Sequence, residues 1–282
     1  MAKPTRRKKP PSPEPTTNAA PTRTNRPDLR ERLLADFAAL KVPLTGDQLD
    51  ALLARAERGG LSHLEFVHAL IAEQAQQRRE RAIARRIKEA CFRDSYTLAD
   101  FDWDFNAKAI NRTQIEELAT AAFIGRQDNL VLVGQSGVGK SRIIQSVGRA
   151  ACVVGYRVRY TTSAELLAKL TASLADRTLP KRLRYYARFD WLIIDEFAFD
   201  KIERSETPQA ANLLYKIIDA RSQRSTTVVT NIDFDAWGAY LDDPPLAMAF
   251  LDRVVDGAII LKINGKSYRA HRAGTKKETA TK

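Results

Sequence analysis

The segment from Gly134 to Ser141 combines glycines, a lysine and a hydroxyl group in a spacing that suits phosphate binding. It reads Gly134-Gln135-Ser136-Gly137-Val138-Gly139-Lys140-Ser141 and matches the phosphate-loop pattern GxxxxGK[ST] at every defined position. Glycines let successive backbone N–H groups curl around an anion, and the following helix points its positive end at the phosphates. We expect these eight residues to hold ATP, with Lys140 on the β- and γ-phosphates and the Ser141 hydroxyl on Mg²⁺.

Two acidic residues follow a second apolar run, as metal-dependent phosphate chemistry requires. Leu192-Ile193-Ile194 has the pattern of a buried strand, and Asp195 and Glu196 come directly after it. Ligands of open α/β sheets bind at the carboxyl ends of the strands, where this acidic pair would meet the phosphate loop. We therefore expect Asp195 to hold Mg²⁺ through water and Glu196 to polarise the attacking water.

Three more polar residues are candidates for the γ-phosphate end of the site. Asn231 follows the strand pattern 226–230 and could contact the γ-phosphate and the water, and the alternative is a turn residue at a strand end. Phosphoryl transfer usually needs another positive charge, often an arginine from a neighbouring subunit. Arg253, before the last strand, is the first candidate, and Arg269 is the second. Each could instead be a structural ion-pair partner.

Strand and helix patterns alternate from residue 129 onward, and these elements must position the candidate residues. Short apolar runs indicate strands over 130–133, 157–161, 191–195, 226–231 and 258–263. Helical spacing of apolar residues indicates helices over 140–154, 164–174, 208–220 and 246–254. This order predicts an α/β fold with a parallel sheet covered by helices on both faces.

The chain before this alternation is organised differently. Residues 1–27 are rich in proline and basic side chains, which predicts a disordered tail that either solubilises the protein or lies on DNA phosphates. Residues 28–94 show only helical patterns and predict a small all-helical N-terminal domain for DNA or oligomer contacts. The α/β domain is expected over 95–270 and a polar tail over 271–282.

Aromatic residues mark the connecting segment between these two patterns. Phe101, Trp103 and Phe105 alternate with aspartates, and a helical pattern follows them. The rings could pack on an adenine base or on the protein core, and we favour the core.

The net charge predicts a polyanionic partner. The 282 residues carry a formal net charge of +12, with a pI of about 9.8, which favours nucleic acid or an anionic membrane. No apolar run approaches the roughly 18 residues that span a bilayer, so we expect no membrane partner. The two cysteines lack metal-ligand spacing, as expected of reduced residues in a cytoplasmic protein.

Two basic clusters are candidates for contacts with double-stranded DNA. The first contains Arg78, Arg79, Arg85 and Arg86, in a basic run that extends to Arg93. The second contains Lys181, Arg182 and Arg184, with Tyr185 and Tyr186 beside them. Because no base-reading motif accompanies them, we expect phosphate-led binding with little sequence preference. The alternatives are a solvated helix face for each cluster and a core position for the tyrosines.

Several segments beyond the phosphate loop resemble the IstB-like helper ATPases of insertion sequences. These are AAA+ proteins related to the DnaC and DnaA replication proteins. The similar segments are 101–105 with 115–119, 151–152 with 155–162, 251–253 and 265–269, and the helical stretch 61–92 is similar to that family's small N-terminal domain. The parts over 155–162 and 267–269 are far more specific than the phosphate loop.

The resemblance implies an ATP-dependent homo-oligomer that binds and deforms DNA and delivers it to a partner transposase. We expect hydrolysis of ATP to release the oligomer from DNA. The resemblance also implies that Arg253 acts across a subunit interface, that Arg269 lies near the nucleotide, and that no helical lid follows.

This sequence departs from the family pattern after Glu196. The residues there are Phe197-Ala198-Phe199, where a glycine-containing turn is common, and the segment 200–207 is unusually charged. The same catalytic residues would serve a DnaC-like replicative helicase loader, which is the alternative function. A small-molecule kinase would need an acceptor pocket and a lid, and the sequence indicates neither.

Overall fold

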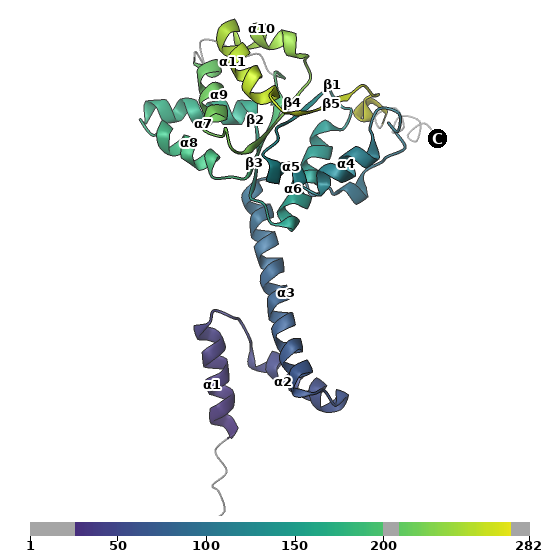
Figure 1. Ribbon diagram of the computed structural model, residues 1–282, viewed down its shortest axis with the longest axis vertical. Helices are drawn as coiled ribbons and strands as arrows, with labels where there is room; N and C mark the ends of the chain where they lie inside the picture. The colour runs from purple at the N-terminus through teal and green to yellow at the C-terminus, as the bar shows by residue number, and fades with distance from the viewer. Residues whose placement is uncertain (1–25, 200–208, 272–282) are drawn as a thin grey trace, which may run out of the picture. The chain divides into compact units, whose positions relative to one another are not determined.

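The computed structural model describes residues 26–199 and 209–271, which form two compact units that divide between Arg78 and Arg79 (Figure 1). This division lies before the boundary expected near residue 94. The reason is that Ile87, Ala90 and Phe92, at and beyond the end of the long helix, pack with the α/β core. Most of the tails expected over 1–27 and 271–282, and all of the charged segment 200–207, lie outside the described residues.

The N-terminal unit is helical, as predicted. It contains α1 (Arg26–Ala39), α2 (Gly46–Gly59) and the first part of α3 (His63–Ala90). Leu49 and Leu52 of α2 pack with Leu44 and Leu70 in a small apolar core. A capping box between Thr45 and Gln48 begins α2, and Gly60, with φ of 59°, ends it in the left-handed region.

The C-terminal unit is built on a five-stranded sheet, in which every pairing is parallel and the spatial order is β2-β3-β4-β1-β5. The strands are β1 (Leu130–Gly134), β2 (Val158–Thr162), β3 (Trp191–Phe197), β4 (Ser225–Thr230) and β5 (Ile259–Ile263). The predicted parallel sheet is therefore confirmed, with each strand within two residues of its expected bounds.

Helices cover both faces of this sheet, as Figure 1 shows. One face packs on α4 (Arg112–Ala119), α5 (Ala122–Arg126) and α6 (Lys140–Val154). The other face packs on α7 (Ser163–Ala175), α8 (Leu179–Ala187), α9 (Ala210–Asp219), α10 (Trp237–Leu241) and α11 (Pro244–Val255). Successive residues of β1 point to opposite faces, so Leu130 and Leu132 join one apolar cluster while Val131 and Val133 join the other.

Short 3₁₀ segments complete the described elements at Leu98–Asp100 and Phe234–Ala236. After β5 the described chain continues to His271 through a single helical turn at 268–271. Among the described residues, no helix is both long enough and apolar enough to cross a bilayer. Cys91 and Cys152 are both free thiols, the first exposed and the second buried.

Candidate nucleotide-binding site

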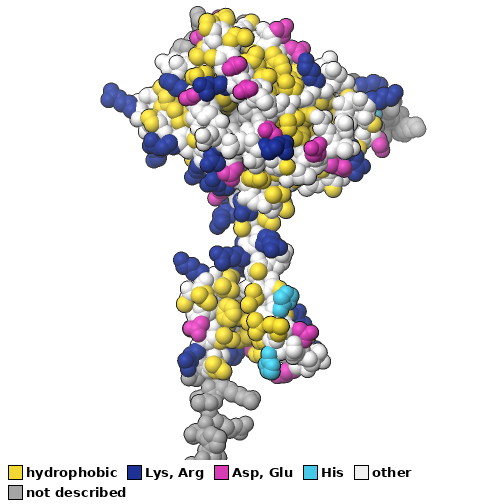
Figure 2. Space-filling model, viewed as in Figure 1, with side chains coloured by type: hydrophobic (Ala, Val, Ile, Leu, Met, Phe, Trp, Pro, Cys, Tyr) yellow, Lys and Arg dark blue, Asp and Glu magenta, His cyan; other side chains and the backbone are white. Residues whose placement is uncertain are grey.

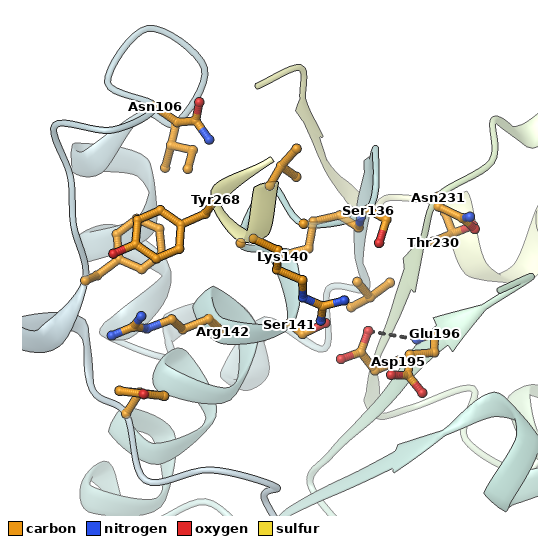
Figure 3. A pocket seen from close by; sticks show the side chains of 18 of the residues that line it. Asn106, Ser136, Lys140, Ser141, Arg142, Asp195, Glu196, Thr230, Asn231 and Tyr268 are labelled. Carbon is orange, nitrogen blue, oxygen red and sulfur yellow. Dashed lines mark hydrogen bonds between the residues drawn. The ribbon is translucent and has the colours of Figure 1, made fainter. Parts of the chain in front are cut away.

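The strand order brings three strand ends together at one edge of the sheet. Strand β4 lies between β1 and β3, so Asn231 follows β4 between the phosphate loop after β1 and the acidic pair at the end of β3. These groups line a cavity of about 320 Å³. Figure 3 shows Lys140 and Ser141 beside the carboxylates of Asp195 and Glu196, with Thr230 and Asn231 close by.

The phosphate loop owes its shape to backbone conformations that glycine permits. Gly137 has φ of 85°, and Gly139, which precedes the first residue of α6, has φ of 105°. A Cβ at Gly137 would overlap the side chain of Ser267, so a larger residue there would be both strained and obstructed. The loop therefore lies at the N-terminus of α6, where backbone N–H groups and the helix dipole favour an anion.

Lys140 places a buried positive charge in the cavity. The residue is 8 % exposed, and its Nζ donates to the carbonyl oxygens of Gly134 and Gln135 at 2.5 and 2.9 Å. Burial lowers the pKa of Lys140, while the negative charge of Asp195 acts in the opposite direction. Phosphate oxygens in the cavity would add further negative charge beside this ammonium group.

Asp195 is almost fully buried, at 1 % exposure. Its Oδ2 accepts from the Tyr160 hydroxyl at 2.8 Å, and its Oδ1 accepts from the backbone N–H of Glu196 at 2.7 Å. Burial and the nearby charge of Asp195 raise the pKa of the Tyr160 phenol, so this hydroxyl remains a donor. No sequence motif singles out Tyr160 for this role. Its place on β2, the strand next to β3, is visible only in the fold.

Glu196 has an environment unlike that of its neighbour. Its φ is 58°, and the register of β3 with β4 shifts between Ile194 and Phe197, so the chain bulges at the acidic pair. The Glu196 side chain is 41 % exposed, and its Oε1 lies 3.0 Å from Nη1 of Arg93. Arg93 ends the basic run that is a candidate for DNA contacts, but in the structure its guanidinium faces the carboxylates of Glu165 and Glu196.

The two candidate arginines lie in different places. Arg269 lines the cavity, and its positive charge lowers the pKa of Lys140 further. Arg253 is not among the lining residues. Its Nη1 lies 3.1 Å from Asp219, and its guanidinium stacks over the ring of Tyr215. Within its own chain, Arg253 is therefore an ion-pair partner.

An apolar wall closes the end of the cavity beside the phosphate loop. Its members are Phe101, Phe105, Ile110 and Tyr268. Asn106 braces this wall, because its side chain exchanges two hydrogen bonds of 3.0 Å with the backbone of Lys266. Phe101 packs on the core as we favoured, but together with Phe105 it also presents a surface to the cavity.

Comparisons with known proteins identify the family. The family model described as "IstB-like ATP binding protein" matches residues 35–276. This chain belongs to the IstB-like ATP-binding family. The match spans both the helical N-terminal residues from Ala35 onward and the α/β unit, which the phosphate loop alone would not have required.

Curated relatives of this IstB-like protein come from insertion sequences. It is 31 % identical over 240 residues to an ATP-binding protein of insertion sequence IS232 from Bacillus thuringiensis subsp. berliner, covering 85 % of this chain and 94 % of that one. It is 30 % identical to the corresponding protein of IS5376 from Geobacillus stearothermophilus, covering 86 % and 94 %. A solved structure of DnaI aligns with a TM-score of 0.49 at 19 % identity, covering 64 % of this chain and 93 % of that chain.

The basic candidates of this IstB-like protein lie on two helices. Arg79, Arg85 and Arg86 are on the C-terminal part of α3, and Arg78 is the last residue of the other unit. Lys181, Arg182 and Arg184 are on α8, where Lys181 and Arg184 are exposed. Figure 2 shows Lys and Arg side chains gathered on the part of the α/β unit that contains α8.

The two tyrosines of α8 differ in how deeply they are buried. Tyr186 is fully buried, so it belongs to the core. Tyr185 is partly exposed, packs edge-on against Tyr186 and Phe189, and lies under the guanidinium of Arg188 at 4.6 Å. Of the pair, Tyr185 is the one with an exposed ring surface.

Proposed function

We propose that this IstB-like protein is a Mg²⁺-dependent ATPase that acts in DNA transposition. One observation supports it above all: Lys140, Asp195 and Glu196 line a single cavity at the ends of parallel strands. A phosphate loop with a carboxylate pair and an apolar wall is the set of groups that nucleotide hydrolysis needs.

The donor set also fits a magnesium ion. The Ser141 hydroxyl and the buried Asp195 carboxylate both line the cavity, and Mg²⁺ prefers oxygen ligands and retains several waters. Held by Ser141 and Asp195, a bound Mg²⁺ would supply positive charge to offset the negative charge that develops on the phosphates. Tyr160 orients Asp195 for this task by donating to Oδ2.

The remaining residues act on the phosphates and on the attacking water. Lys140 and Arg269 bring positive charge to the γ-phosphate end, Glu196 holds and polarises the water, and Asn231 helps to position it. Arg253 would complete the charge balance from a neighbouring subunit of a homo-oligomer. The adenine base would stack on the apolar wall formed by Phe101, Phe105, Ile110 and Tyr268.

Duplex DNA and a transposase are the proposed partners. The basic side chains of α3 and α8 suit a phosphate backbone, and a net charge of +12 favours a polyanion. The names of the curated relatives place those proteins in insertion sequences. Those names favour the transposition role over helicase loading. The oligomer would hold and deform target DNA in its ATP state and release it after hydrolysis.

Phosphate release by the purified chain tests this proposal directly. We expect Mg²⁺-dependent release of phosphate from ATP, with assembly on duplex DNA of any sequence when ATP is present. The Lys140→Ala variant is the control and should lose both, because it lacks the charge that holds the phosphates. Release by Lys140→Ala at the wild-type rate, or transfer of phosphate to a small acceptor, would contradict the proposal.

A further inference from the structure

Arg93 forms an ion pair with Glu196, the residue that polarises the attacking water in the proposed function. Its Nη1 lies 3.0 Å from Oε1 of Glu196, and its Nη2 lies 3.2 Å from Oε1 of Glu165. One guanidinium thus binds two carboxylates, one at the end of β3 and the other in the first turn of α7. This use of Arg93 differs from the phosphate contact that its basic neighbours suggested.

The backbone at Arg93 is tied to the phosphate-loop helix. Its N–H donates to Oε1 of Gln145 at 2.7 Å, and Nε2 of Gln145 donates to the carbonyl oxygen of Ser141 at 3.2 Å. The preceding residue, Phe92, packs against the core beside Tyr160. Arg93 therefore occupies a defined position between the α6 helix and the acidic pair, even though its side chain is 45 % exposed.

The contact with Arg93 interferes with the proposed role of Glu196, which is to polarise the attacking water. A carboxylate that polarises water must accept a hydrogen bond from that water and draw its proton. The Arg93 guanidinium donates a charge-assisted hydrogen bond to Oε1 of Glu196, so it competes with the water for that oxygen and holds the side chain toward Arg93.

We propose that Arg93 is a positioning residue that restrains Glu196 and so limits the rate of ATP hydrolysis by the isolated chain. The inference rests on the proposed ATPase function and deepens it by naming the residue that holds the rate down. The restraint is weak and reversible, because an exposed ion pair of this kind shifts an equilibrium by at most about fivefold. The site is then ready for hydrolysis once Arg93 is drawn to another anion.

Steady-state phosphate release by three variants tests this role. Arg93→Gln should raise kcat about two- to fivefold and leave KM for ATP nearly unchanged, because the contact touches the water-handling carboxylate and not the phosphate loop. Arg93→Lys keeps a positive charge and should return kcat toward the wild-type value. Glu165→Gln is the matched control, since it removes the other partner of Arg93 and leaves the contact with Glu196 in place, and its kcat should not rise.

Two outcomes separate failure of this inference from failure of the proposed function. Phosphate release by the wild type with a kcat for Arg93→Gln that is equal or lower would overturn the role of Arg93 alone. No phosphate release from any variant, with or without duplex DNA, would overturn the ATPase itself. Thermal unfolding and binding of a fluorescent ATP analogue should be unchanged in Arg93→Gln, which shows that a change in kcat does not come from misfolding.

Discussion

Two adjacent carboxylates in this protein have opposite environments. Asp195 is buried and accepts hydrogen bonds from a tyrosine and from the backbone, whereas Glu196 is half-exposed and faces an arginine. A strand places successive side chains on opposite sides, and the bulge at Glu196 turns it further. The buried carboxylate suits an ion, and the exposed one suits water.

Glu196→Gln should separate binding from hydrolysis. The amide keeps the shape of the side chain but cannot draw a proton, so we expect kcat to fall about 100-fold or more while ATP binding is retained. Phosphate release and equilibrium binding of a fluorescent ATP analogue measure the two properties. A variant that hydrolyses ATP at the wild-type rate would show that Glu196 does not handle the water.

Tyr160→Phe should weaken the dependence on Mg²⁺ without removing any proposed ligand. The hydroxyl that orients Asp195 is lost, and loss of such an orienting partner typically costs about tenfold in metal affinity. The concentration of Mg²⁺ that gives half-maximal ATP hydrolysis should therefore rise. Tyr156→Phe, before β2 and outside the residues that line the cavity, is the control and should behave as the wild type does.

At the level of secondary structure, the sheet sets the positions of the phosphate loop and the acidic pair. Helices set the positions of the basic side chains. Strand β4 separates β1 from β3 and sets the gap between Lys140 and Asp195. Helix α8 buries Tyr186 and thereby directs Lys181 and Arg184 to solvent. The apolar side of this helix thus fixes where its charges point.

The double variant Lys181→Glu, Arg184→Glu should lower both DNA affinity and its salt dependence. Each lost phosphate contact reduces the slope of log K against log salt by about 1, so the pair should reduce it by about 2. Binding to a short duplex at several salt concentrations gives this slope. Lys108→Glu, Lys216→Glu makes the same charge change at exposed positions outside the two basic clusters, and its slope should stay near that of the wild type.

For the whole molecule, the position of Arg253 indicates that the nucleotide site of a single chain is incomplete. Arg253 pairs with Asp219 of its own chain and is not among the residues that line the cavity, so one chain alone does not bring it to the phosphates. An arginine supplied by a neighbouring subunit is a common solution in phosphoryl transfer. The proposed homo-oligomer would then be required for full activity.

Mixing two inactive variants tests this arrangement. Arg253→Ala has an intact cavity but supplies no arginine to its neighbour, whereas Glu196→Gln supplies the arginine but has an inactive cavity. We expect the mixture to recover ATP hydrolysis that neither variant shows alone. Lys140→Ala mixed with Glu196→Gln is the control, because both changes lie in the same cavity and each leaves that site inactive. No recovery in the first mixture would contradict action across an interface.

Features that depend on local spacing could be predicted from the amino-acid sequence. The phosphate loop, the bounds of α6, the five strands and the acidic pair follow from residues that are close together along the chain. Local patterns report them because backbone conformation and the periodicity of apolar side chains are set by near neighbours.

Tertiary structure alone decided which distant residues meet. The strand order, the support of Asp195 by Tyr160, the wall containing Phe105 and Tyr268, and the contact of Arg93 with Glu196 join segments that are far apart in the chain. It also decided that the division between the units lies at Arg78, since Ile87 and Ala90 have the same helical pattern whichever core they join. Such contacts depend on how complete elements pack, and no local spacing records that packing.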